Sequence, residues 1–329
     1  MDTIRWGIMG TGNIAHKFAR GLALLPDAEV VSVGSRRQET ADAFGDEFSV
    51  PHRHASYDAL VGDGDVDVVY VSTPHTFHRD NTLLALEAGK HVLCEKPFAI
   101  NARQARDMVE AARDKGRFLM DAVWSRFLPT HVRAREILAS GVLGEIRMVH
   151  ADFGFRGTVD PRQRLFNPEL GGGALLDVGI YDVQLASMVF GEAPTEIAAL
   201  TSIGSTGVDE QSAMLLEYSG GRMAQLSCAI RTTTHHEASF FGTEGRLRLE
   251  APWWRGTALT VWMRPGPEGG ETSHHPYEGN GYQHEAAEVM ACLRAGKLES
   301  DIMPLDETLS LMETLDAVRA QWGLVYPME

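Results

Sequence analysis

The sequence predicts an α/β protein that begins with a doubly wound parallel sheet and continues as an α+β region built on a large, mostly antiparallel open sheet. Between residues 4 and 122, short apolar strands alternate with helical stretches, and no two-residue hairpin joins the strands. Beyond residue 145, longer strands follow one another through short glycine-rich links. We therefore expect two domains, residues 1–122 and 123–329.

The first region contains five strand patterns that read as continuous apolar runs, which is typical of parallel strands covered on both faces. Amphipathic helical patterns separate them. The predicted strands are 4–10, 29–35, 66–72, 91–95 and 117–123, and the predicted helices are 14–25, 40–48, 81–88 and 102–115.

The second region opens with a predicted helix at 129–138. Its strand patterns favour an antiparallel meander, with helices on one face. The predicted strands are 145–155, 195–203, 212–219, 222–230, 237–242, 245–250 and 258–264, and the helices are 175–190, 285–295 and 305–322. Residues 265–281 are rich in glycine and proline and are expected to form a long loop.

Composition excludes several classes of function. The chain has 329 residues, of which 44% are hydrophobic and 23% charged, and its net charge of −15 opposes binding to nucleic acid or to an anionic membrane. No apolar run approaches the roughly 20 residues of a membrane span. A strand begins within four residues of the first methionine, so we expect no secretion signal. Three scattered cysteines predict neither a disulfide framework nor a zinc site. These features favour a cytoplasmic protein.

The first strand runs into a G-x-G-x-x-A pattern, with Gly10, Gly12, Asn13 and Ile14 leading to Ala15. The first glycine permits a tight turn, the second lets a pyrophosphate approach the backbone, and the small last residue allows close helix packing. The phosphates would lie over the helix N-terminus. Because the pattern sits between a strand and a helix, it predicts a Rossmann dinucleotide site. A glycine-rich turn without a ligand is the alternative.

The second strand ends in Ser35, Arg36 and Arg37. An NAD-binding chain usually has a carboxylate here for the ribose hydroxyl, whereas a hydroxyl and two guanidiniums suit the 2′-phosphate of NADP. Glu39 and Asp42 lie too far into the following helix to replace that carboxylate. We expect NADP rather than NAD, unless the two arginines are only solvated side chains at a helix start.

The third strand ends in Thr73, Pro74, His75 and, one turn later, His78. Ligands of open parallel sheets bind outside the carboxyl ends of the strands, so these residues should border the cofactor. The two histidines could suggest a metal pair. Zinc needs three or four ligands, however, and no third ligand is near in sequence. Histidines that line the site or cap the helix are favoured, and no metal is expected.

The fourth strand ends in Glu95, Lys96 and Pro97. A lysine at the tip of a buried strand is costly unless something there needs its charge. This tip reaches the rim where a nicotinamide would lie. Lys96 is therefore predicted to deliver a cation to the reaction centre.

A proton acceptor is offered by the segment GGGALLDVGIYD, where Asp177 and Tyr181 are four residues apart and share one helix face. Tyrosine has an unperturbed pKa near 10, and a neighbouring ammonium such as that of Lys96 favours the phenolate. The two side chains could form an acid/base pair for alcohol oxidation. The alternative is that Asp177 and Tyr181 only pack and cap.

Together, these motifs resemble the glucose–fructose oxidoreductase/inositol dehydrogenase (Gfo/Idh/MocA) family over nearly the whole chain. The resemblance rests on Gly10–Ala15, Glu95–Pro97, Leu143–Ile146 and the segment ending at Tyr181. Within the family, residues 118–127 and 302–305, together with Tyr181, resemble a branch of dimeric trans-dihydrodiol dehydrogenases and NADP-dependent D-xylose 1-dehydrogenases. Many relatives have histidine where this chain has tyrosine.

The resemblance implies that Lys96 and Tyr181 carry the proton transfer and that Asp177 orients the substrate. It also implies that Arg164 lies near the nicotinamide, with Glu95 at the same rim, and that dimers form across the face of the C-terminal sheet. The positions it implies for substrate binding are Trp124, Arg126, Phe153, Asp177, Tyr181 and Trp253. The aromatic residues could instead be plain core side chains.

The expected function is NADP-dependent oxidation of a cyclic polyol or aldopyranose: a D-xylose-type sugar to a lactone, or a trans-dihydrodiol to a catechol. One alternative is reduction of a keto-sugar of the anhydrofructose type. A second is an NADP-binding sensor without chemistry, although a sensor needs no proton acceptor. A metal hydrolase built on residues 235–237 is disfavoured, because adjacent histidines on a strand point to opposite faces.

Overall fold

The computed structural model describes residues 3–264, 266 and 268–329, and these form two compact units. Unit 1 comprises the chain up to Arg126 together with Glu278–Leu309, and unit 2 comprises Phe127–Tyr277 with Ser310–Glu329. The predicted cut after residue 122 lies near the first boundary. The structure differs in returning residues 278–309 to the first unit, so a single cut does not describe the chain.

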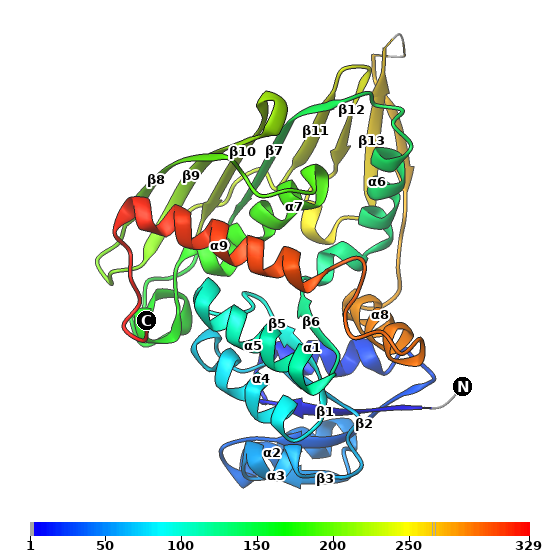
Figure 1. Cartoon of the computed structure of the whole chain (residues 1–329), viewed down its shortest axis with the longest axis vertical. Coiled ribbons are helices and arrows are strands. Elements are labelled where there is room, and N and C mark those ends of the chain that lie inside the picture. Colours follow the sequence, from blue (N-terminus) through cyan, green and yellow to red (C-terminus); the bar gives the residue numbers. More distant parts are fainter. Residues whose placement is uncertain (1–2, 265, 267) are drawn as a thin grey trace. The chain divides into compact units, whose positions relative to one another are not determined.

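Unit 1 is built on a six-stranded parallel sheet with the order β3-β2-β1-β4-β5-β6 (Figure 1). The strand order reverses between β1 and β4, which is where sheets of this kind bind dinucleotides. The strands are β1 (Ile4–Met9), β2 (Ala28–Gly34), β3 (His52–His54), β4 (Val68–Val71), β5 (His91–Glu95) and β6 (Leu119–Ala122). The predicted doubly wound parallel sheet is confirmed.

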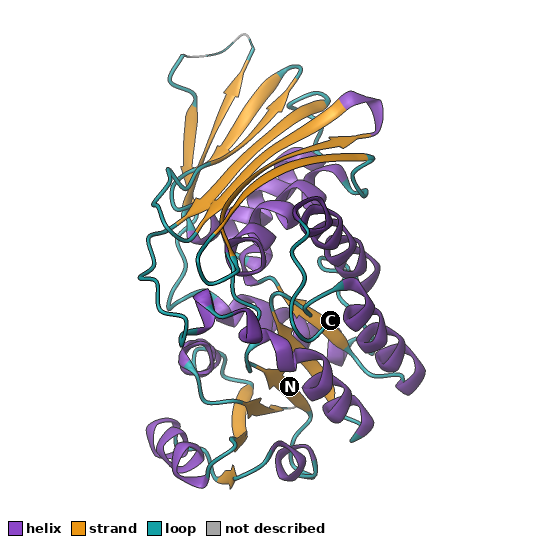
Figure 2. Cartoon of the chain, turned by 90° about the vertical axis from the view of Figure 1, so that its left-hand side faces the viewer, coloured by secondary structure: helices purple, strands orange, loops and turns teal. Residues whose placement is uncertain are grey.

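Helices cover both faces of this sheet (Figure 2). They are α1 (Asn13–Leu22), α2 (Gln38–Phe48), α3 (Tyr57–Val61), α4 (His78–Glu87), α5 (Ala102–Lys115) and α8 (Tyr282–Arg294), with a 3₁₀ turn η1 (His75–Phe77) before α4 and another, η2 (Trp124–Phe127), after β6. Helix α8 packs against α1, which is why this late segment belongs to unit 1. Sequence patterns did not predict β3 or α3, and β3 is a three-residue edge strand of polar residues with no apolar run.

Unit 2 is built on an eight-stranded sheet with the order β14-β13-β12-β11-β7-β10-β9-β8. Its strands are β7 (Ile146–Gly154), β8 (Glu196–Ile203), β9 (Asp209–Tyr218), β10 (Arg222–Ala229), β11 (Ala238–Gly242), β12 (Gly245–Leu249), β13 (Ala258–Met263) and β14 (Glu271–His274). All pairings are antiparallel except that of β7 with β10, which is parallel, so the predicted meander needs this correction. Strand β14 also forms inside the predicted 265–281 loop, of which residues 265 and 267 lie outside the described residues.

The helices of unit 2 lie on one face of its sheet (Figure 2). They are α6 (Pro129–Ala139), the π-helical turn η5 (Leu175–Gly179), α7 (Ile180–Phe190) and most of α9 (Leu305–Trp322), whose first turn belongs to unit 1. Short 3₁₀ turns are η3 (Arg164–Phe166), η4 (Pro168–Leu170), η6 (Ser219–Gly221) and η7 (Trp253–Arg255). Along β9, buried and exposed positions alternate, as expected for a sheet covered on one side.

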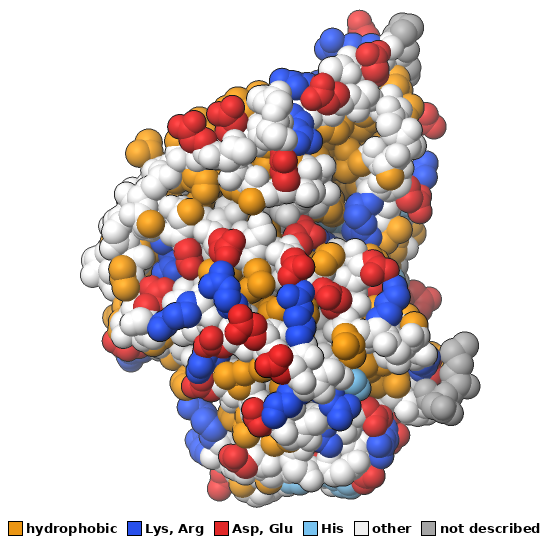
Figure 3. Space-filling model, viewed as in Figure 1, with side chains coloured by type: hydrophobic (Ala, Val, Ile, Leu, Met, Phe, Trp, Pro, Cys, Tyr) orange, Lys and Arg blue, Asp and Glu red, His pale blue; other side chains and the backbone are white. Residues whose placement is uncertain are grey.

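Large apolar side chains remain exposed on unit 2, with Leu200 at 80% and Leu215 at 45% of full exposure. Both come from the paired strands β8 and β9. Elsewhere, acidic and basic side chains are interspersed on the face drawn in Figure 3. The homodimer through the unit 2 sheet stays a prediction.

One described helical segment, Pro168–Phe190, is long and apolar enough to span a membrane by length and composition. The segment contains Asp177 and Asp182, so it is not an uninterrupted apolar run. Within the protein, 83% of the tested window is buried, and a buried core helix passes the same test.

Candidate active site

The glycine-rich turn of unit 1 leaves the backbone open above α1. Gly10 has φ +102°, and a Cβ there would meet the Ser72 carbonyl oxygen at 3.3 Å, so only glycine is unstrained. A Cβ on Gly12 would meet nothing within 4 Å. Gly12 caps α1 without a side-chain hydrogen bond, which leaves the helix N–H groups beside Asn13 and Ile14 to a ligand. This turn fits a pyrophosphate.

The end of β2 carries the residues that are predicted to favour binding of NADP over NAD. The Ser35 hydroxyl lies 2.6 Å from that of Thr40, and Arg37 is the N-cap of α2. Arg36 and Arg37 are exposed, and neither forms an ion pair with a described residue. The Glu39 and Asp42 carboxylates lie on α2 itself. Two unpaired guanidiniums at a helix start fit an added phosphate.

The tips of β4 and β5 are joined through His78, which is fully buried. Its Nδ1 lies 2.8 Å from the Pro97 carbonyl oxygen, and its Nε2 lies 2.8 Å from that of Thr73. The Asn81 amide also donates to the Thr73 hydroxyl at 2.9 Å. His75 is buried beside His78, with ring centroids 5.7 Å apart. His78 therefore ties the two strand tips together, and the predicted role of the two histidines in lining the cofactor site stays a prediction.

Lys96 follows β5 at the same rim and is half-buried. Glu95 turns inward: one carboxylate oxygen accepts a hydrogen bond from the Tyr70 hydroxyl, and the other accepts the Lys96 backbone N–H at 3.2 Å. Burial and the charges of Glu95 and Glu285 hold the pKa of Tyr70 well above its usual value. Glu95 is thus a buried anchor for the backbone that carries the lysine.

Two further buried carboxyls of unit 1 lie near this strand tip. Burial and the charge of Glu95 raise the pKa of Asp121 to about 8, against the lowering effects of Arg126 and Lys96. Burial also raises the pKa of Glu285, with Glu95 and Asp121 adding to the effect. Neither carboxyl was predicted from the sequence, because the groups that surround each of them lie far away in sequence.

Trp124 and Arg126 each contact other residues of unit 1. The Trp124 ring stacks on Tyr282 at 4.6 Å between centroids. The Arg126 guanidinium is 1% exposed and donates to both carboxylate oxygens of Glu307 at 2.6 and 2.9 Å, and to the Ile302 carbonyl at 3.0 Å. These contacts hold the start of α9, so Arg126 supports the fold of this unit. A role for it in substrate binding stays a prediction.

In unit 2, three glycines precede the turn that carries Asp177 and Tyr181. Asp177 belongs to the π-helical turn η5, and Tyr181 follows in the first turn of α7. Single π-helical turns within helices are frequent at functional sites. The Arg164 guanidinium donates to the Asp177 carboxylate at 2.7 Å, which fixes that carboxylate. The structure therefore places the predicted site residues Arg164, Asp177 and Tyr181 at the same turn of unit 2.

An aromatic cluster surrounds Tyr181. The ring of Phe153 on β7 lies 5.5 Å from that of Tyr181, and the half-buried Trp254 stacks on Phe153 at 3.4 Å. The neighbouring Trp253 is fully buried, and its indole N–H donates to the Asp152 carbonyl at 2.9 Å. The prediction named Trp253, but its neighbour Trp254 is the tryptophan with accessible surface. An adjacent pair of tryptophans in sequence gives no signal for which one points inward.

The two tryptophans give a paired prediction. We expect Trp254→Ala to raise KM for substrate about tenfold, because it removes the ring that stacks on Phe153, the aromatic neighbour of Tyr181. We expect Trp253→Phe to lower the free energy of unfolding by about 2 kcal/mol, with little change in KM, because it creates a cavity and leaves a carbonyl unpaired. Steady-state kinetics and urea unfolding of both variants check this. An unchanged KM in Trp254→Ala contradicts it.

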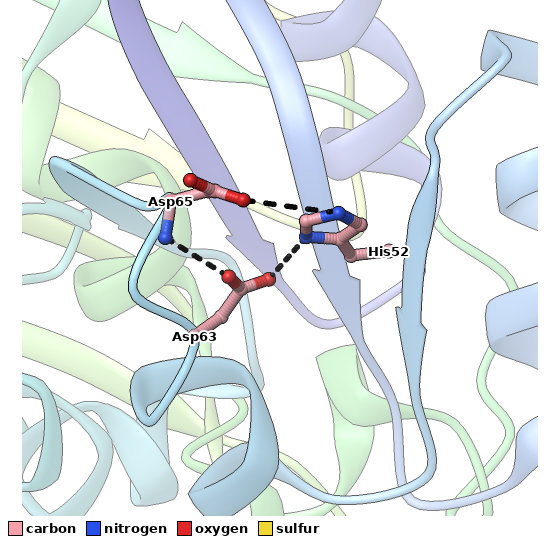
Figure 4. A group of neighbouring side chains, drawn as sticks. All are labelled: His52, Asp63 and Asp65. Carbon is pink, nitrogen blue, oxygen red and sulfur yellow. Dashed lines mark hydrogen bonds and ion pairs between the residues drawn. The ribbon is translucent and has the colours of Figure 1, made fainter.

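A further polar cluster lies at the edge of unit 1, where the edge strand β3 pairs with β2 (Figure 4). His52 Nδ1 lies 2.7 Å from the Asp63 carboxylate, His54 Nε2 lies 3.2 Å from it, and the Asp65 backbone N–H donates to it at 3.0 Å. Burial would raise the pKa of Asp63, but these hydrogen bonds outweigh it and hold the pKa below its usual range. These hydrogen bonds to the Asp63 carboxylate explain how the side chains of the cluster are arranged.

Two protein-family models match this chain. A model of an NAD-binding Rossmann fold in an oxidoreductase family (GFO/IDH/MocA) matches residues 4–122, and a model of the GFO/IDH/MocA C-terminal domain matches residues 131–248. The chain belongs to the GFO/IDH/MocA family. The resemblance inferred from the motifs is confirmed, and the nicotinamide cofactor follows from it.

Curated relatives match over the full length. The trans-1,2-dihydrobenzene-1,2-diol dehydrogenase of Mus musculus is 39% identical, with 99% of each chain covered. The enzyme of the same name from Homo sapiens is 38% identical, again with 99% of each chain covered. The chain is therefore an NAD(P)-dependent oxidoreductase that acts on CH–OH groups.

Solved structures of two oxidoreductases are similar to this chain over nearly its whole length. A 3-ketoreductase from Actinomadura kijaniata (KijD10), in complex with NADP and TDP-benzene, has a TM-score of 0.85 and 28% identity, covering 97% of this chain and 98% of its own. An aldose-aldose oxidoreductase from Caulobacter crescentus, complexed with glycerol, has a TM-score of 0.87 and 27% identity, covering 98% of each chain. Structures of the ketoreductase include variants with one tyrosine changed to phenylalanine or one lysine changed to alanine.

Proposed function

We propose that this GFO/IDH/MocA oxidoreductase uses NADP to oxidise a ring hydroxyl of a cyclic polyol or aldopyranose. The observation that carries the proposal is the Arg164–Asp177 pair, whose carboxylate lies on the π-helical turn, one helical turn before Tyr181 and the Phe153 ring. A carboxylate, a phenol and flat aromatic walls suit a sugar or diol ring. The comparisons support this substrate class, because curated relatives are named for a dihydrodiol and a structural neighbour for aldoses.

Proton handling is assigned to Tyr181 and Lys96. The bound nicotinamide supplies the hydride acceptor at C4 of its ring. Tyr181 accepts the proton of the reacting hydroxyl, and Asp177, held by Arg164, accepts a hydrogen bond from the substrate. Lys96 contributes a positive charge that favours the phenolate of Tyr181. A xylose-type sugar would yield a lactone, and a trans-dihydrodiol would yield a ketone that tautomerises to a catechol.

The cofactor is assigned to unit 1. Gly10, Gly12 and the start of α1 bind the pyrophosphate, and the rim from Thr73 to His78 and at Glu95 borders the nicotinamide. Ser35, Arg36 and Arg37 bind the 2′-phosphate, which makes NADP the expected cofactor rather than NAD. The NADP bound to the Actinomadura ketoreductase supports this choice.

Cofactor preference is tested by removing both guanidiniums. We expect the double variant Arg36→Ala/Arg37→Ala to raise KM for NADP+ about 100-fold, because two charge-assisted hydrogen bonds at about 1.5 kcal/mol each are lost. KM for NAD+ should stay within about twofold. Arg103→Ala, which removes an exposed arginine from α5, is the control and should change neither value. Equal KM changes for both cofactors would refute the assignment.

Substrate class is tested by NADPH formation at 340 nm with D-xylose, D-glucose, L-arabinose and a trans-dihydrodiol, each with NADP+ and with NAD+. Turnover of a pentose or diol supports the proposal. No turnover of any of them, with NADPH still bound, contradicts it.

Keto-sugar reduction is the second candidate, favoured by the similarity to a 3-ketoreductase. It uses the same residues in the opposite direction, with Tyr181 donating the proton. Consumption of NADPH by a keto-sugar such as an anhydrofructose, without oxidation of the panel, would select it. A protein that binds NADPH but turns over neither set would be a sensor.

The homodimer is also part of the proposal. The exposed Leu200 and Leu215 on β8 and β9 support the unit 2 sheet as the interface. Sedimentation equilibrium checks it, and a monomer at micromolar concentration contradicts it.

A further inference from the structure

The turn that carries Asp177 and Tyr181 is held by two side chains that come from far away in sequence. The Tyr326 hydroxyl donates to the Gly172 carbonyl at 2.7 Å. The Asp209 carboxylate accepts the backbone N–H of Leu175 at 2.7 Å, at the start of the π-helical turn. Tyr326 is 1% exposed and Asp209 is fully buried. Both bonds fix the backbone immediately before the two side chains assigned to the reaction.

The glycines of this turn are what allow the close approach. A Cβ on Gly173 would overlap the Asp209 carboxylate and lie 3.2 Å from the Tyr326 hydroxyl, and its φ is +126°. A Cβ on Gly172 would overlap the Arg164 carbonyl oxygen. Gly172 and Gly173 are thus explained by backbone and side-chain atoms that pack closely against them.

The segment Tyr326–Glu329 is itself locked in place. The buried Arg319 guanidinium, on α9, donates to the two carboxylate oxygens of Glu329 at 2.8 and 2.9 Å. The Tyr326 backbone N–H donates to Glu329 at 2.8 Å, and the Arg319 guanidinium lies 5.0 Å from the centre of the Tyr326 ring. These contacts fix the direction in which the Tyr326 hydroxyl points.

We propose that Asp209 and the Tyr326–Glu329 segment are positioning elements for the reaction, which hold the turn that places Asp177 and Tyr181. This inference rests on the proposed function of Tyr181. Neither residue touches substrate in this account, so each acts through the backbone of residues 172–175. A peptide segment about 150 residues away in sequence thereby becomes necessary for full activity.

Ionisation of Asp209 should change kcat with pH, an effect that packing alone would not produce. Burial raises the pKa of Asp209 to about 7, against the lowering effects of the Leu175 N–H and Arg319. The other titratable groups that face it are Tyr326 on the segment and Cys228 on β10; burial raises both of their pKa values, and the charge of Asp209 adds to each. Above pH 7 the ionised carboxylate binds the N–H groups of the helix start more strongly. We therefore expect an inflection of kcat near pH 7.

The test compares Tyr326→Phe and Asp209→Asn with Tyr218→Phe, a control that removes a buried hydroxyl elsewhere in unit 2. Each is assayed as the full chain with NADP+ and the panel substrate that is turned over. We expect Tyr326→Phe to lower kcat five- to tenfold, the size of one neutral hydrogen bond, with the Kd for NADPH unchanged in a fluorescence titration. Asp209→Asn should remove the inflection near pH 7, whereas Tyr326→Phe should keep it.

Each outcome decides one question. If Tyr326→Phe keeps wild-type kcat while Tyr181→Phe is inactive, the positioning inference is wrong and the proposed function stands. If Tyr326→Phe and Tyr218→Phe lower kcat and the melting temperature equally, Tyr326 is only structural and the inference is also wrong. If Tyr181→Phe itself keeps wild-type activity, the proposed function fails, whatever Tyr326 does.

Discussion

Replacing Tyr181 by phenylalanine is expected to lower kcat about 1,000-fold. A positioned acid or base contributes about 10²–10⁴-fold to such a step, and this variant removes the proton acceptor while keeping the ring. The packing of the ring against Phe153 at 5.5 Å should persist, so stability should change little. KM for NADP+ should also be retained, because the pyrophosphate-binding turn belongs to unit 1. Initial rates at 340 nm, with the Kd for NADPH measured separately, check both statements.

Tyr218→Phe is the matched control for Tyr181→Phe. Tyr218 is a buried tyrosine of the same unit whose ring packs against Phe190 at 4.4 Å. Removing its hydroxyl should leave kcat within about twofold. A Tyr181→Phe variant as active as this control would refute the assignment of Tyr181 as the proton acceptor.

Replacing Lys96 by methionine is expected to lower kcat about 100-fold at pH 7. Methionine keeps the length of the side chain but removes the charge that favours the phenolate, and each pKa unit of that preference corresponds to about 1.4 kcal/mol. Part of the activity should return as the pH is raised, because hydroxide then ionises the tyrosine. Rates from pH 6 to 10 under saturating NADP+ check this.

Lys90 provides a control at the opposite end of the same strand. Its ammonium donates to the carbonyl oxygens of Asp63 at 2.6 Å and Val66 at 2.9 Å, just before β5 begins. Lys90→Met should reduce stability by removing these two hydrogen bonds, yet its pH dependence of kcat should match the wild type. A Lys96→Met variant that behaves in the same way would show that Lys96 is structural.

Local sequence patterns were enough to predict most of the fold of unit 1. The G-x-G-x-x-A turn and the tips of β4 and β5 are continuous in sequence, and the parallel sheet brings their ends to one edge. Strand β3 could not be predicted, because pairing with β2 makes it a strand and its own residues do not. The return of α8 to unit 1 likewise depends on its packing against α1.

Long-range contacts limited the prediction of the site. Nothing near Asp177 in sequence indicates Asp209 or Tyr326, which reach its turn only after the sheet and α9 have formed. The choice between Trp253 and Trp254 depends on how η7 orients them, and two adjacent tryptophans do not reveal it. The parallel pairing of β10 with β7 was missed for a related reason, because neighbouring glycine-rich links favour hairpins.

The pH dependence of kcat/KM in wild type and Lys96→Met tests the central claim, that a lysine-assisted Tyr181 accepts the substrate proton. We expect the apparent pKa of the basic form to rise in the variant towards about 10, the value of an unassisted phenol. The plateau at high pH should approach that of the wild type. Identical pH profiles with a uniformly lower rate would contradict the account, because Lys96 would then not act on the ionisation of the proton acceptor.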